Sequence, residues 1–289
     1  MKIFKTYTFF FLLMSMLLGL PSLLLAKAED KMERTYPLER DGKIFLKYKS
    51  GDIAVNNWNR NEVKIIAHQD ADIDINQSKG NIRIIVKRSK SSFFELFIPD
   101  KAQLRIETQS GKVKAREIGG FVDIRTASGD LEVIMAQNGA RCKTISGDIR
   151  IGEIQGNAYL ETVSGRIAVK GVKGSIKAGT VSGNIEIGAF SQSEEIEIES
   201  ISGNIKLQGE FSPGGIYKID SHSGNIEIGL PPASNFELRV GTFSGNIHCD
   251  FELKVSGKID RKKLQGMVGK GGSSLTLSSF SGNIRINKR

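Results

Sequence analysis

The sequence predicts an all-β fold: a parallel β-solenoid, of the right-handed β-helix type, with rungs of about 18–21 residues. Three observations predict it. A Ser-Gly-Asn tripeptide, or a near variant, returns at an almost fixed interval; the residues around it alternate between apolar and polar; and β-branched residues are frequent on both sides. A fixed period near 20 residues is typical of stacked units, and a two-residue alternation is typical of half-buried strands.

The glycines of the tripeptide define the rungs. The first five are 18 residues apart, steps of 20, 21 and 21 follow, and a step of 37 closes the series. Each Gly follows a Ser, and most precede Asn or Asp. Gly gives the backbone freedom that a bend needs, and Asn or Asp tolerates the same conformation. The predicted structural bends are Gly111, Gly129, Gly147, Gly165, Gly183, Gly203, Gly224, Gly245 and Gly282.

Strands are predicted on both sides of each bend. In most units the seventh and fifth residues before the Gly are apolar or small, the third is Thr or Ser, and the second and fourth after it are apolar. Around Gly203 these are Ile196 and Ile198 on one side, and Ile205 and Leu207 on the other. Such alternation places one set of side chains inside and the other in water. Each unit is therefore a strand, a bend, a strand and a return turn, stacked in parallel at about 4.8 Å per rung.

The third residue after each Gly is predicted to point outward. These residues alternate in sign almost rung by rung, as in Lys114, Glu132 and Arg150. Opposite charges that neighbour each other in a parallel stack stabilise it modestly. We therefore expect a solvated, self-neutralising face, with a substrate groove as the alternative.

Residues 1–28 have the pattern of an export signal. Lys2 and Lys5 precede an apolar run, and Ala26-Lys27-Ala28 fits the small-x-small cleavage pattern. We expect a protein exported to the periplasm, the cell surface or the medium. The alternative is a membrane-anchored protein, because the apolar run is about long enough to span a bilayer if it stays uncleaved.

The mature chain divides into two parts. Residues 29–105 repeat less regularly and are expected to form irregular N-terminal β rungs or a cap, because the edge of a stack needs protection; a separate small β domain is the alternative. Residues 106–289 are expected to form the regular solenoid. The long last step between glycines places an insertion loop at 252–273.

Several phrases of the sequence resemble one protein family. They are the stretch 51–64 with Trp58-Asn59-Arg60, the phrase 98–102, the Ser-Gly-Asp/Asn bends, and the ending from Leu264-Gln265-Gly266 to Ile284. Over about residues 40–289 the chain resembles the bacterial putative-adhesin family of β-strand-repeat proteins, a domain-of-unknown-function family. The resemblance implies a non-enzymatic role in the cell envelope. It supplies no catalytic or binding residues that could be carried over to this chain.

The charge balance excludes some partners and favours others. The net charge is +9, and without the three Lys of the leader it is 38 − 32, or +6. This is mildly basic, and no nucleic-acid-binding motif accompanies it, so we expect no nucleic acid as a partner. For an exported chain, an anionic envelope polymer, a lipid surface or a protein partner is the more natural expectation.

The insertion loop is the candidate ligand-binding segment. Insertions in repeat proteins form loops on one face, often the binding face, and cations there could hold phosphate or carboxylate groups. The alternative is a solvated hairpin that caps the last rung. The candidate residues are Lys254, Lys258, Arg261, Lys262, Lys263 and Lys270.

No motif indicates catalysis, a metal or a small-molecule cofactor. Asp70, Asp72 and Asp74 are spaced like the start of a calcium loop, but Ile75 occupies the position that requires Gly. The Gly-rich stretch 266–274 lacks the phosphate-loop pattern, because Gly271 follows Lys270 where Ser or Thr is needed.

One pair of carboxylates gives the enzyme alternative a concrete form. Glu199 and Asp220 each lie four residues before a bend Gly, on successive rungs. Their backbones would be about 5 Å apart, near the separation that retaining glycosidases use. Against a polysaccharide-cleaving site, the one aromatic residue noted nearby, Tyr217, is predicted to point inward.

The two cysteines are predicted to be unpaired. Cys142 and Cys249 both fall at inward positions, five rungs apart and hence about 24 Å from each other. A disulfide needs Cα atoms within about 7 Å. We therefore predict two buried free thiols.

Together these observations predict an exported cell-envelope β-solenoid that acts as a non-catalytic binding, adhesin-like or scaffold module. A polysaccharide-acting β-helix enzyme and an envelope-stress sensing protein are the alternatives.

Overall fold

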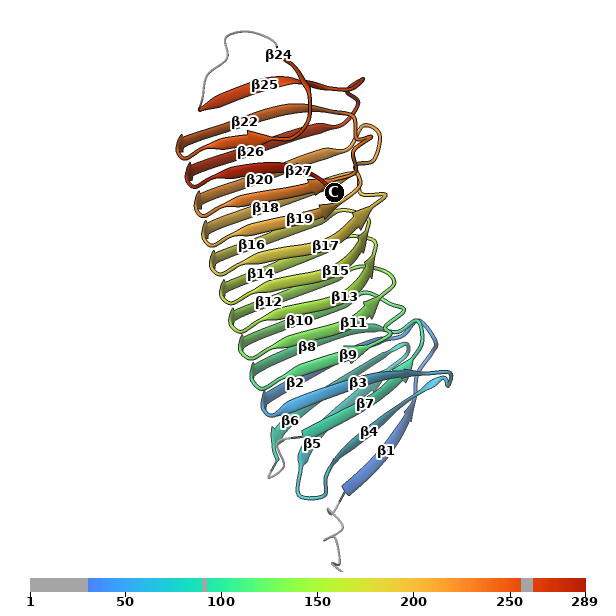
Figure 1. The fold of residues 1–289 in the computed structure, drawn as a ribbon. Coiled ribbons are helices and arrows are strands. Elements are labelled where there is room, and N and C mark those ends of the chain that lie inside the picture. Colours follow the sequence, from blue (N-terminus) through green and yellow to red (C-terminus); the bar gives the residue numbers. More distant parts are fainter. Residues whose placement is uncertain (1–30, 90–92, 256–261) are drawn as a thin grey trace, which may run out of the picture. The chain divides into compact units, whose positions relative to one another are not determined.

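The computed structural model describes residues 31–89, 93–255 and 262–289. The predicted leader at 1–28 lies outside the described residues. The regular structure in the described part consists of strands, arranged in two sheets (Figure 1). This confirms the predicted all-β solenoid. Within the same residues, no helix could cross a bilayer.

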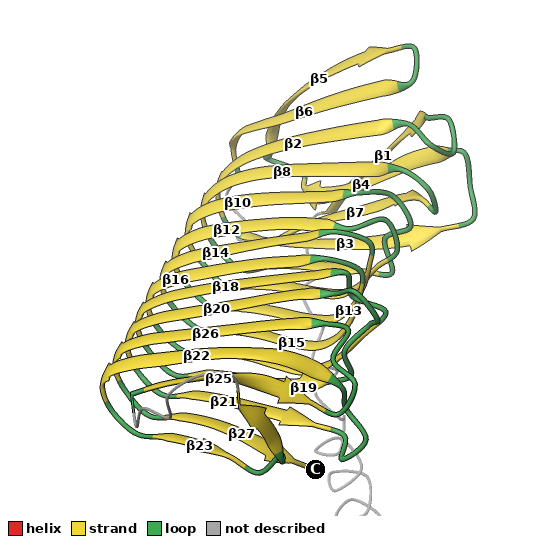
Figure 2. Cartoon of the chain, turned by 90° about the horizontal axis from the view of Figure 1, so that it is seen from above, coloured by secondary structure: helices red, strands yellow, loops and turns green. Residues whose placement is uncertain are grey.

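The sheets contain thirteen and fourteen of the described strands and face each other across the core (Figure 2). In spatial order, the first sheet consists of β1 (Lys31–Pro37), β4 (Glu62–His68), β7 (Phe93–Pro99), β3 (Asp52–Trp58), β9 (Val113–Arg116), β11 (Leu131–Ala136), β13 (Ile149–Gln155), β15 (Ile167–Lys173), β17 (Ile185–Ser191), β19 (Ile205–Gly209), β21 (Ile226–Leu230), β27 (Ile284–Lys288) and β23 (Ile247–Cys249). The second sheet consists of β24 (Leu253–Val255), β25 (Lys263–Val268), β22 (Phe236–Ser244), β26 (Ser274–Ser281), β20 (Ile216–Ser223), β18 (Glu195–Ser202), β16 (Ile176–Ser182), β14 (Ala158–Ser164), β12 (Ala140–Ser146), β10 (Val122–Ser128), β8 (Gln103–Ser110), β2 (Lys43–Ser50), β6 (Asn81–Arg88) and β5 (Asp72–Ser78).

The middle of the stack follows the chain order. From β8 and β9 to β20 and β21, each rung contributes one strand to each sheet and pairs in parallel with the rungs before and after it. The alternating pattern decides which side chains enter the core. Ile196, Ile198 and Leu207, for example, have no exposed surface.

The ends of the stack do not follow the chain order, and here sequential stacking was the wrong prediction. At the C-terminal end, β26 lies between β20 and β22, and β27 lies between β21 and β23. The last rung of the sequence is therefore the second-to-last rung in space. At the N-terminal end, β2 lies between β6 and β8 in the same way. Every rung carries the same apolar period, so the sequence pattern does not distinguish these orders.

Antiparallel strands close both ends of the stack. β25 pairs with β22, and β24 pairs with β25, so the predicted insertion loop contains two strands that cover the last rung. At the other end β5 pairs with β6, and β4 pairs with β7 and β1. Such strands protect an edge that would otherwise pair with another chain.

The bend glycines stack on one another with no space for a side chain. A Cβ atom on Gly147 would lie 2.2 Å from the carbonyl oxygen of Gly129, and one on Gly203 would lie 1.9 Å from that of Gly183. The φ angles of Gly147 and Gly203 are 152° and 154°. Gly is therefore needed both for its backbone conformation and for the close approach of the next rung.

The residue after each Gly forms a second column. The side-chain Oδ1 of Asn184 accepts a hydrogen bond from the backbone N–H of Asn204 at 2.9 Å, and Asn204 does the same for Asn225. The column continues through Asn283 to Asn246, which repeats the non-sequential order of the last rungs. Asn and Asp thus link adjacent rungs and do more than tolerate the bend.

The two cysteines are free, as predicted. Cys142 is fully buried, and burial raises the pKa of its thiol to about 12. Cys249 is half-buried, and the prediction that it is buried was wrong, because it ends the short edge strand β23. The inserted rung places six rung steps, not five, between the two residues.

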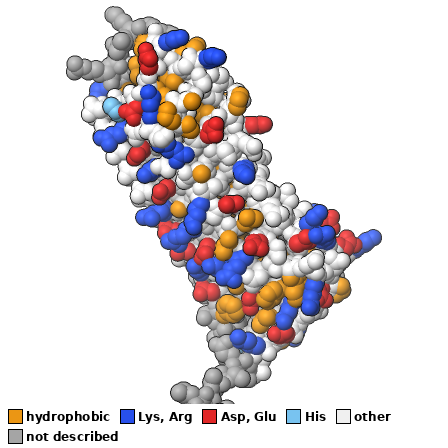
Figure 3. Space-filling model, turned by 45° about the vertical axis from the view of Figure 1, so that its right-hand side comes forward, with side chains coloured by type: hydrophobic (Ala, Val, Ile, Leu, Met, Phe, Trp, Pro, Cys, Tyr) orange, Lys and Arg blue, Asp and Glu red, His pale blue; other side chains and the backbone are white. Residues whose placement is uncertain are grey.

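The outward charges of the first sheet lie next to opposite charges. The Lys114 and Lys112 ammonium groups each lie 2.7 Å from the Glu132 carboxylate. Farther along, Glu186, Lys206 and Glu227 are register partners on successive strands. Figure 3 shows acidic and basic side chains interspersed along one face of the molecule.

Candidate functional site

The outer face of the second sheet carries three rows of side chains. Because side chains alternate along a strand, the residues six, four and two positions before each bend Gly lie on the outer side of the sheet, where Asp123 is the buried exception. We call this surface, from β8 to β22, the ladder face, and its rows the outer, middle and apolar rows. The apolar row lies nearest the bend. In spatial order it contains Ile145, Val163, Val181, Ile201, His222, Phe280 and Phe243.

The apolar row is unusually exposed for its composition. Val163 is 42% exposed, Ile201 54% and Phe243 73%. The register of the strands places each member beside the next, so the row forms one continuous strip in which His222 is the polar member. Scattered exposed apolar residues are normal on a protein surface, but contiguous apolar strips mark interaction sites.

The aromatic end of the apolar row is stacked. The rings of His222 and Phe280 lie 4.9 Å apart and within 8° of parallel, and those of Phe280 and Phe243 lie 4.9 Å apart and within 6°. The inserted position of β26 is what places Phe280 between the other two rings. Since the rings cover each other's faces, they offer mainly their edges to a partner.

The middle and outer rows are charged, and most of their charges are paired within the chain. Lys143 pairs with Glu161. The Lys177 and Glu197 side chains lie 2.6 Å apart, and Lys218 lies 3.2 Å from Asp220. The hydrogen bond from Lys177 lowers the pKa of the Glu197 carboxyl.

Arg141, Glu199 and Arg239 on this face form no ion pair within the described residues. Arg141 lies over the ring of Tyr159, with its guanidinium carbon 5.3 Å from the ring centroid. Glu199 neighbours Asp220, its register partner on β20, which is also acidic. Like charges that lie side by side in a sheet are destabilising, so this arrangement needs a partner or a functional reason.

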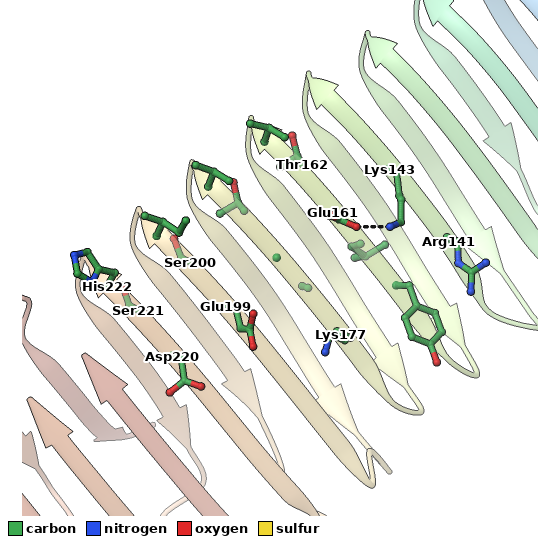
Figure 4. Close-up of a pocket in the computed structure, with 18 of the residues that line it drawn as sticks. Arg141, Lys143, Glu161, Thr162, Lys177, Glu199, Ser200, Asp220, Ser221 and His222 are labelled. Carbon is green, nitrogen blue, oxygen red and sulfur yellow. Dashed lines mark ion pairs between the residues drawn. The ribbon is translucent and has the colours of Figure 1, made fainter. Parts of the chain in front are cut away.

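A groove of about 980 Å³ runs over the ladder face (Figure 4). Its floor is lowest where Gly179 leaves the middle row without a side chain, between Glu161 and Glu199. Val181 and Ile201 of the apolar row line one side. The groove therefore offers an apolar edge and a charged floor that cross several rungs.

A smaller hollow of about 500 Å³ lies on the second sheet nearer the N-terminal end. It surrounds Phe45, whose ring has the guanidinium of Arg83 at 4.5 Å and that of Arg105 at 5.7 Å. These cations are already engaged with the ring, so the hollow is a weaker candidate than the groove.

The cations of the insertion loop are not gathered in one hollow. Lys254 lines a hollow of about 340 Å³ with Asn235 and Lys288. Lys263 lies opposite Gly241 on the neighbouring strand. The Lys262 ammonium donates a hydrogen bond to the carbonyl oxygen of Gly245 at 2.5 Å, and Lys270 is exposed. The predicted Lys258 and Arg261 lie outside the described residues.

The carboxylates of the enzyme alternative are brought together on the groove floor. Glu199 and Asp220 are register partners, as predicted, and Tyr217 is buried. Asp220 is paired with Lys218 and not with a group that it could activate. Within the described residues, no three His, Cys, Asp or Glu side chains gather as metal ligands.

The sequence reasoning missed the apolar row and the exposed ring of Tyr159, which is 41% exposed. The signal was present. The second residue before the bend Gly is a large apolar residue in six rungs, although it points outward as the charged fourth and sixth residues do. An apolar residue that recurs at the same outward-facing position of successive strands predicts an exposed apolar strip.

A comparison with models of protein families gives a match over most of the chain. A family model described as Toastrack DUF4097 matches residues 43–153, 95–213 and 213–287, which together span most of the chain. No curated protein matches the chain.

Solved structures of bacterial proteins are also similar to it. A "putative adhesin" from Bacteroides fragilis is 12% identical, with a TM-score of 0.48, and the match covers 90% of this chain and 98% of that one. A "putative adhesin" from Parabacteroides distasonis is 9% identical, with a TM-score of 0.37 and the same two coverages. A "putative lipid binding protein" from Parabacteroides distasonis is 10% identical, with a TM-score of 0.35, and again covers 90% and 98%.

Proposed function

The chain belongs to the Toastrack DUF4097 family, and from this premise we propose that it is a non-catalytic binding or scaffold module of the cell envelope that works through its ladder face. The export pattern of residues 1–28 supports the location. The rigid stack supports the role, because repeat folds present extended surfaces to their partners.

The single observation that carries the proposal is the groove beside the apolar row. The row crosses seven rungs and is therefore about 30 Å long. A soluble protein gains nothing in stability by exposing Ile145, Ile201 and Phe280 at half or more of their surface. An elongated partner that covers the row would remove this apolar area from water.

The chemistry of the groove favours binding over catalysis. The charged side chains on its floor are mostly engaged in ion pairs that cross from rung to rung, such as Lys177 with Glu197. Such pairs orient a partner and select among partners more than they add affinity. A binding role needs no activated nucleophile and no cofactor.

Retention on envelope fractions tests the proposal. Val181→Asp with Ile201→Asp places charge in the apolar row at exposed positions, so the fold should tolerate both changes. Ile216→Asp is the matched control, because Ile216 is 58% exposed but does not line the groove. We expect the wild type and the control to be retained and the double variant to be lost. Equal retention of all three would overturn the proposal.

The insertion loop is a second candidate surface, for an anionic envelope polymer or lipid surface. Lys254, Lys263 and Lys270 are exposed and form no ion pair within the described residues. Each cation near an anionic surface contributes about 1 kcal/mol. We therefore infer salt-sensitive binding through this end of the molecule.

Co-sedimentation with anionic liposomes over a salt series tests the loop. The variant changes Lys254, Lys263 and Lys270 to Gln, and the control changes Lys170, Lys173 and Lys206 to Gln in the middle of the stack. Binding lost only in the loop variant supports the second surface. Equal loss in both variants would show that net charge alone attracts the protein, and the loop would then be a cap only.

A further inference from the structure

The partner of the ladder face can be named from its charge pattern. Resting on the proposed function, which makes this face the working surface, we propose that it binds the same face of a second copy of this chain. The two stacks run in opposite directions. The two-fold axis lies parallel to the strands and passes between β14 and β16, so that β12 faces the partner's β18, and β10 faces the partner's β20.

The middle row is self-complementary under this operation. Lys143 meets Glu199 of the second copy, and Arg125 meets Asp220. Glu161 meets Gly179, whose missing side chain leaves space for it. Because the interface is isologous, each of these pairs occurs twice.

The outer row is complementary in the same register. Arg141 meets Glu197 of the second copy, whereas Asp123, which lies opposite Lys218, is buried and accepts hydrogen bonds from Arg125 of its own chain. Lys177 meets the exposed ring of Tyr159, a pairing of a cation with an aromatic face. The three charged pairs between solvent-accessible side chains in the two rows are all of opposite sign.

The apolar row meets itself. Ile145 lies against Ile201 of the second copy, and Val163 lies against Val181. These four side chains are 42–56% exposed in the single chain. Their burial supplies the hydrophobic contribution to association, whereas the charged rows set the register.

Two of the charges without an ion pair in the described residues, Arg141 and Glu199, are the strongest argument for this occupant. The second copy supplies Glu197 to Arg141 and Lys143 to Glu199. In a two-fold interface both copies present the same residues, so an unpaired positive charge on one strand needs an unpaired negative charge on the strand that faces it. Arg141 on β12 and Glu199 on β18, three rungs apart, lie on facing strands.

Other arrangements bring like charges together. A shift of the axis onto β16 places Arg141 against Lys218 and Glu161 against Glu199. A shift onto β14 places Arg141 against Lys177. Two stacks that run in the same direction place the apolar row against the charged outer row. Like-charge contacts across an interface are unfavourable, so they select against these other registers.

A glycan fits the face less well than a second copy. Sugar rings bind through the faces of aromatic rings, and the faces of Phe280 are covered by His222 and Phe243. The exposed edges of these rings fit aliphatic and aromatic side chains instead.

The size of the face predicts a weak dimer. The rungs that overlap are the eight from β8 to β26. Eight rungs at about 4.8 Å each and five residues of each strand at about 3.3 Å each give an area of about 600 Å² on each copy, or about 1,200 Å² in total. This is the low end of the range for specific interfaces. The dimer should therefore depend on protein concentration.

Sedimentation velocity of the chain from residue 31 onward, over a concentration series, tests the proposal with two matched variants. Gly179→Tyr fills the space that Glu161 of the second copy would occupy, and Gly171→Tyr is its control on the first sheet. A Cβ atom at either position would lie 3.7 Å or more from its nearest neighbour, and neither Gly has a left-handed φ. We expect a dimer from the wild type and the control, and a dissociation constant at least ten-fold higher for Gly179→Tyr. Equal association of both variants would overturn the proposed register.

A charge exchange tests the register independently. Lys143→Glu and Glu199→Lys each place like charges across the interface and should raise the dissociation constant at least ten-fold. The double variant restores opposite charges on both sides of the axis and should restore association. Failure of the double variant to associate better than both single variants would contradict the isologous pairing, with thermal unfolding showing that each variant is folded.

The same variants separate the two proposals. If the wild type is monomeric at every concentration, yet Val181→Asp with Ile201→Asp abolishes envelope retention, the second copy is wrong and the working face stands. If the wild type associates but the apolar-row variant is retained normally, the face serves assembly and the proposed envelope partner binds elsewhere.

Discussion

The Gly and the Asn of the Ser-Gly-Asn bend have separate structural roles. The sequence was sufficient to predict the bend, because spacing and residue type were enough. It could not predict that a Cβ atom on Gly147 would meet the Gly129 carbonyl oxygen, or that Asn204 would accept a hydrogen bond from Asn225. Those contacts depend on which atoms of one rung lie over which atoms of the next.

The glycine column should tolerate no side chain. Gly147→Ala places a Cβ atom 2.2 Å from a carbonyl oxygen at a φ of 152°. We expect it to lower the free energy of unfolding by roughly 1–3 kcal/mol or more, seen as a lower midpoint of thermal unfolding. Gly179→Ala is the control, because its Cβ atom would lie 3.9 Å from the nearest atom. Equal midpoints for the two variants would show that the column is not closely packed.

The Asn/Asp column has a gap that can be filled. Arg166 donates its backbone N–H to Asp148 but has no side-chain oxygen for the next rung, and its exposed side chain makes no ion pair within the described residues. Arg166→Asn should add one rung-to-rung hydrogen bond to Asn184 and raise the free energy of unfolding by about 0.5–1.5 kcal/mol. Chemical denaturation measures the change. An unchanged or lower stability would mean that the column contributes nothing here.

Glu132 should contribute to stability only above acidic pH. Hydrogen bonds from Lys112 and Lys114 lower its pKa from 4.5 to about 2. A carboxyl whose pKa is lower in the folded state stabilises it above the unfolded pKa, and this contribution is lost as the pH falls through the folded pKa. Glu132→Gln should therefore unfold at a lower temperature than the wild type at pH 7, and the difference should shrink between pH 4.5 and 2. A difference that does not vary with pH would contradict this assignment.

At the scale of the element, the strands were predictable and their order at the ends was not. Alternation identifies a strand and its buried face, because both depend on neighbouring residues. Rung order depends on which edges meet, and β20, β22 and β26 present nearly the same apolar pattern. The insertion at 252–273 was the visible signal. It gives the chain the length to cap the stack and return into the remaining gap.

The rung formed by β22 and β23 should depend on the rung formed by β26 and β27, which follows it in sequence. A chain that ends at Ser273 lacks β26 and β27, which are the parallel neighbours of β22 and β23. We expect amide hydrogen exchange to show loss of protection in β22, β23 and β25, while β10 to β17 stay protected, because repeat stacks are stabilised mainly by nearest neighbours. Retained protection in β22 would mean that β22 can pair directly with β20 when β26 is absent.

At the scale of the whole molecule, the stack converts a repeated sequence into a patterned surface. The groove on the second sheet was not predicted. The outward positions of its strands were expected to be charged, whereas Val163, Val181 and Ile201 occupy some of them. Once the strands are stacked, these residues form one continuous strip beside complementary charges. The two-fold pattern becomes visible only when rungs far apart in the sequence are compared across an axis.

A disulfide cross-link across the ladder face tests most directly whether two copies of the chain pair through this face. Ile145→Cys with Ile201→Cys is made in a Cys249→Ser background, because Cys142 is buried. Within one chain the two positions are three rungs apart, about 14 Å, too far for a disulfide. In the proposed dimer they face each other. Mild oxidation should give a covalent dimer from the double variant and from neither single variant. No dimer from the double variant, or equal dimer from the single variants, would contradict the claim that this face is the interface.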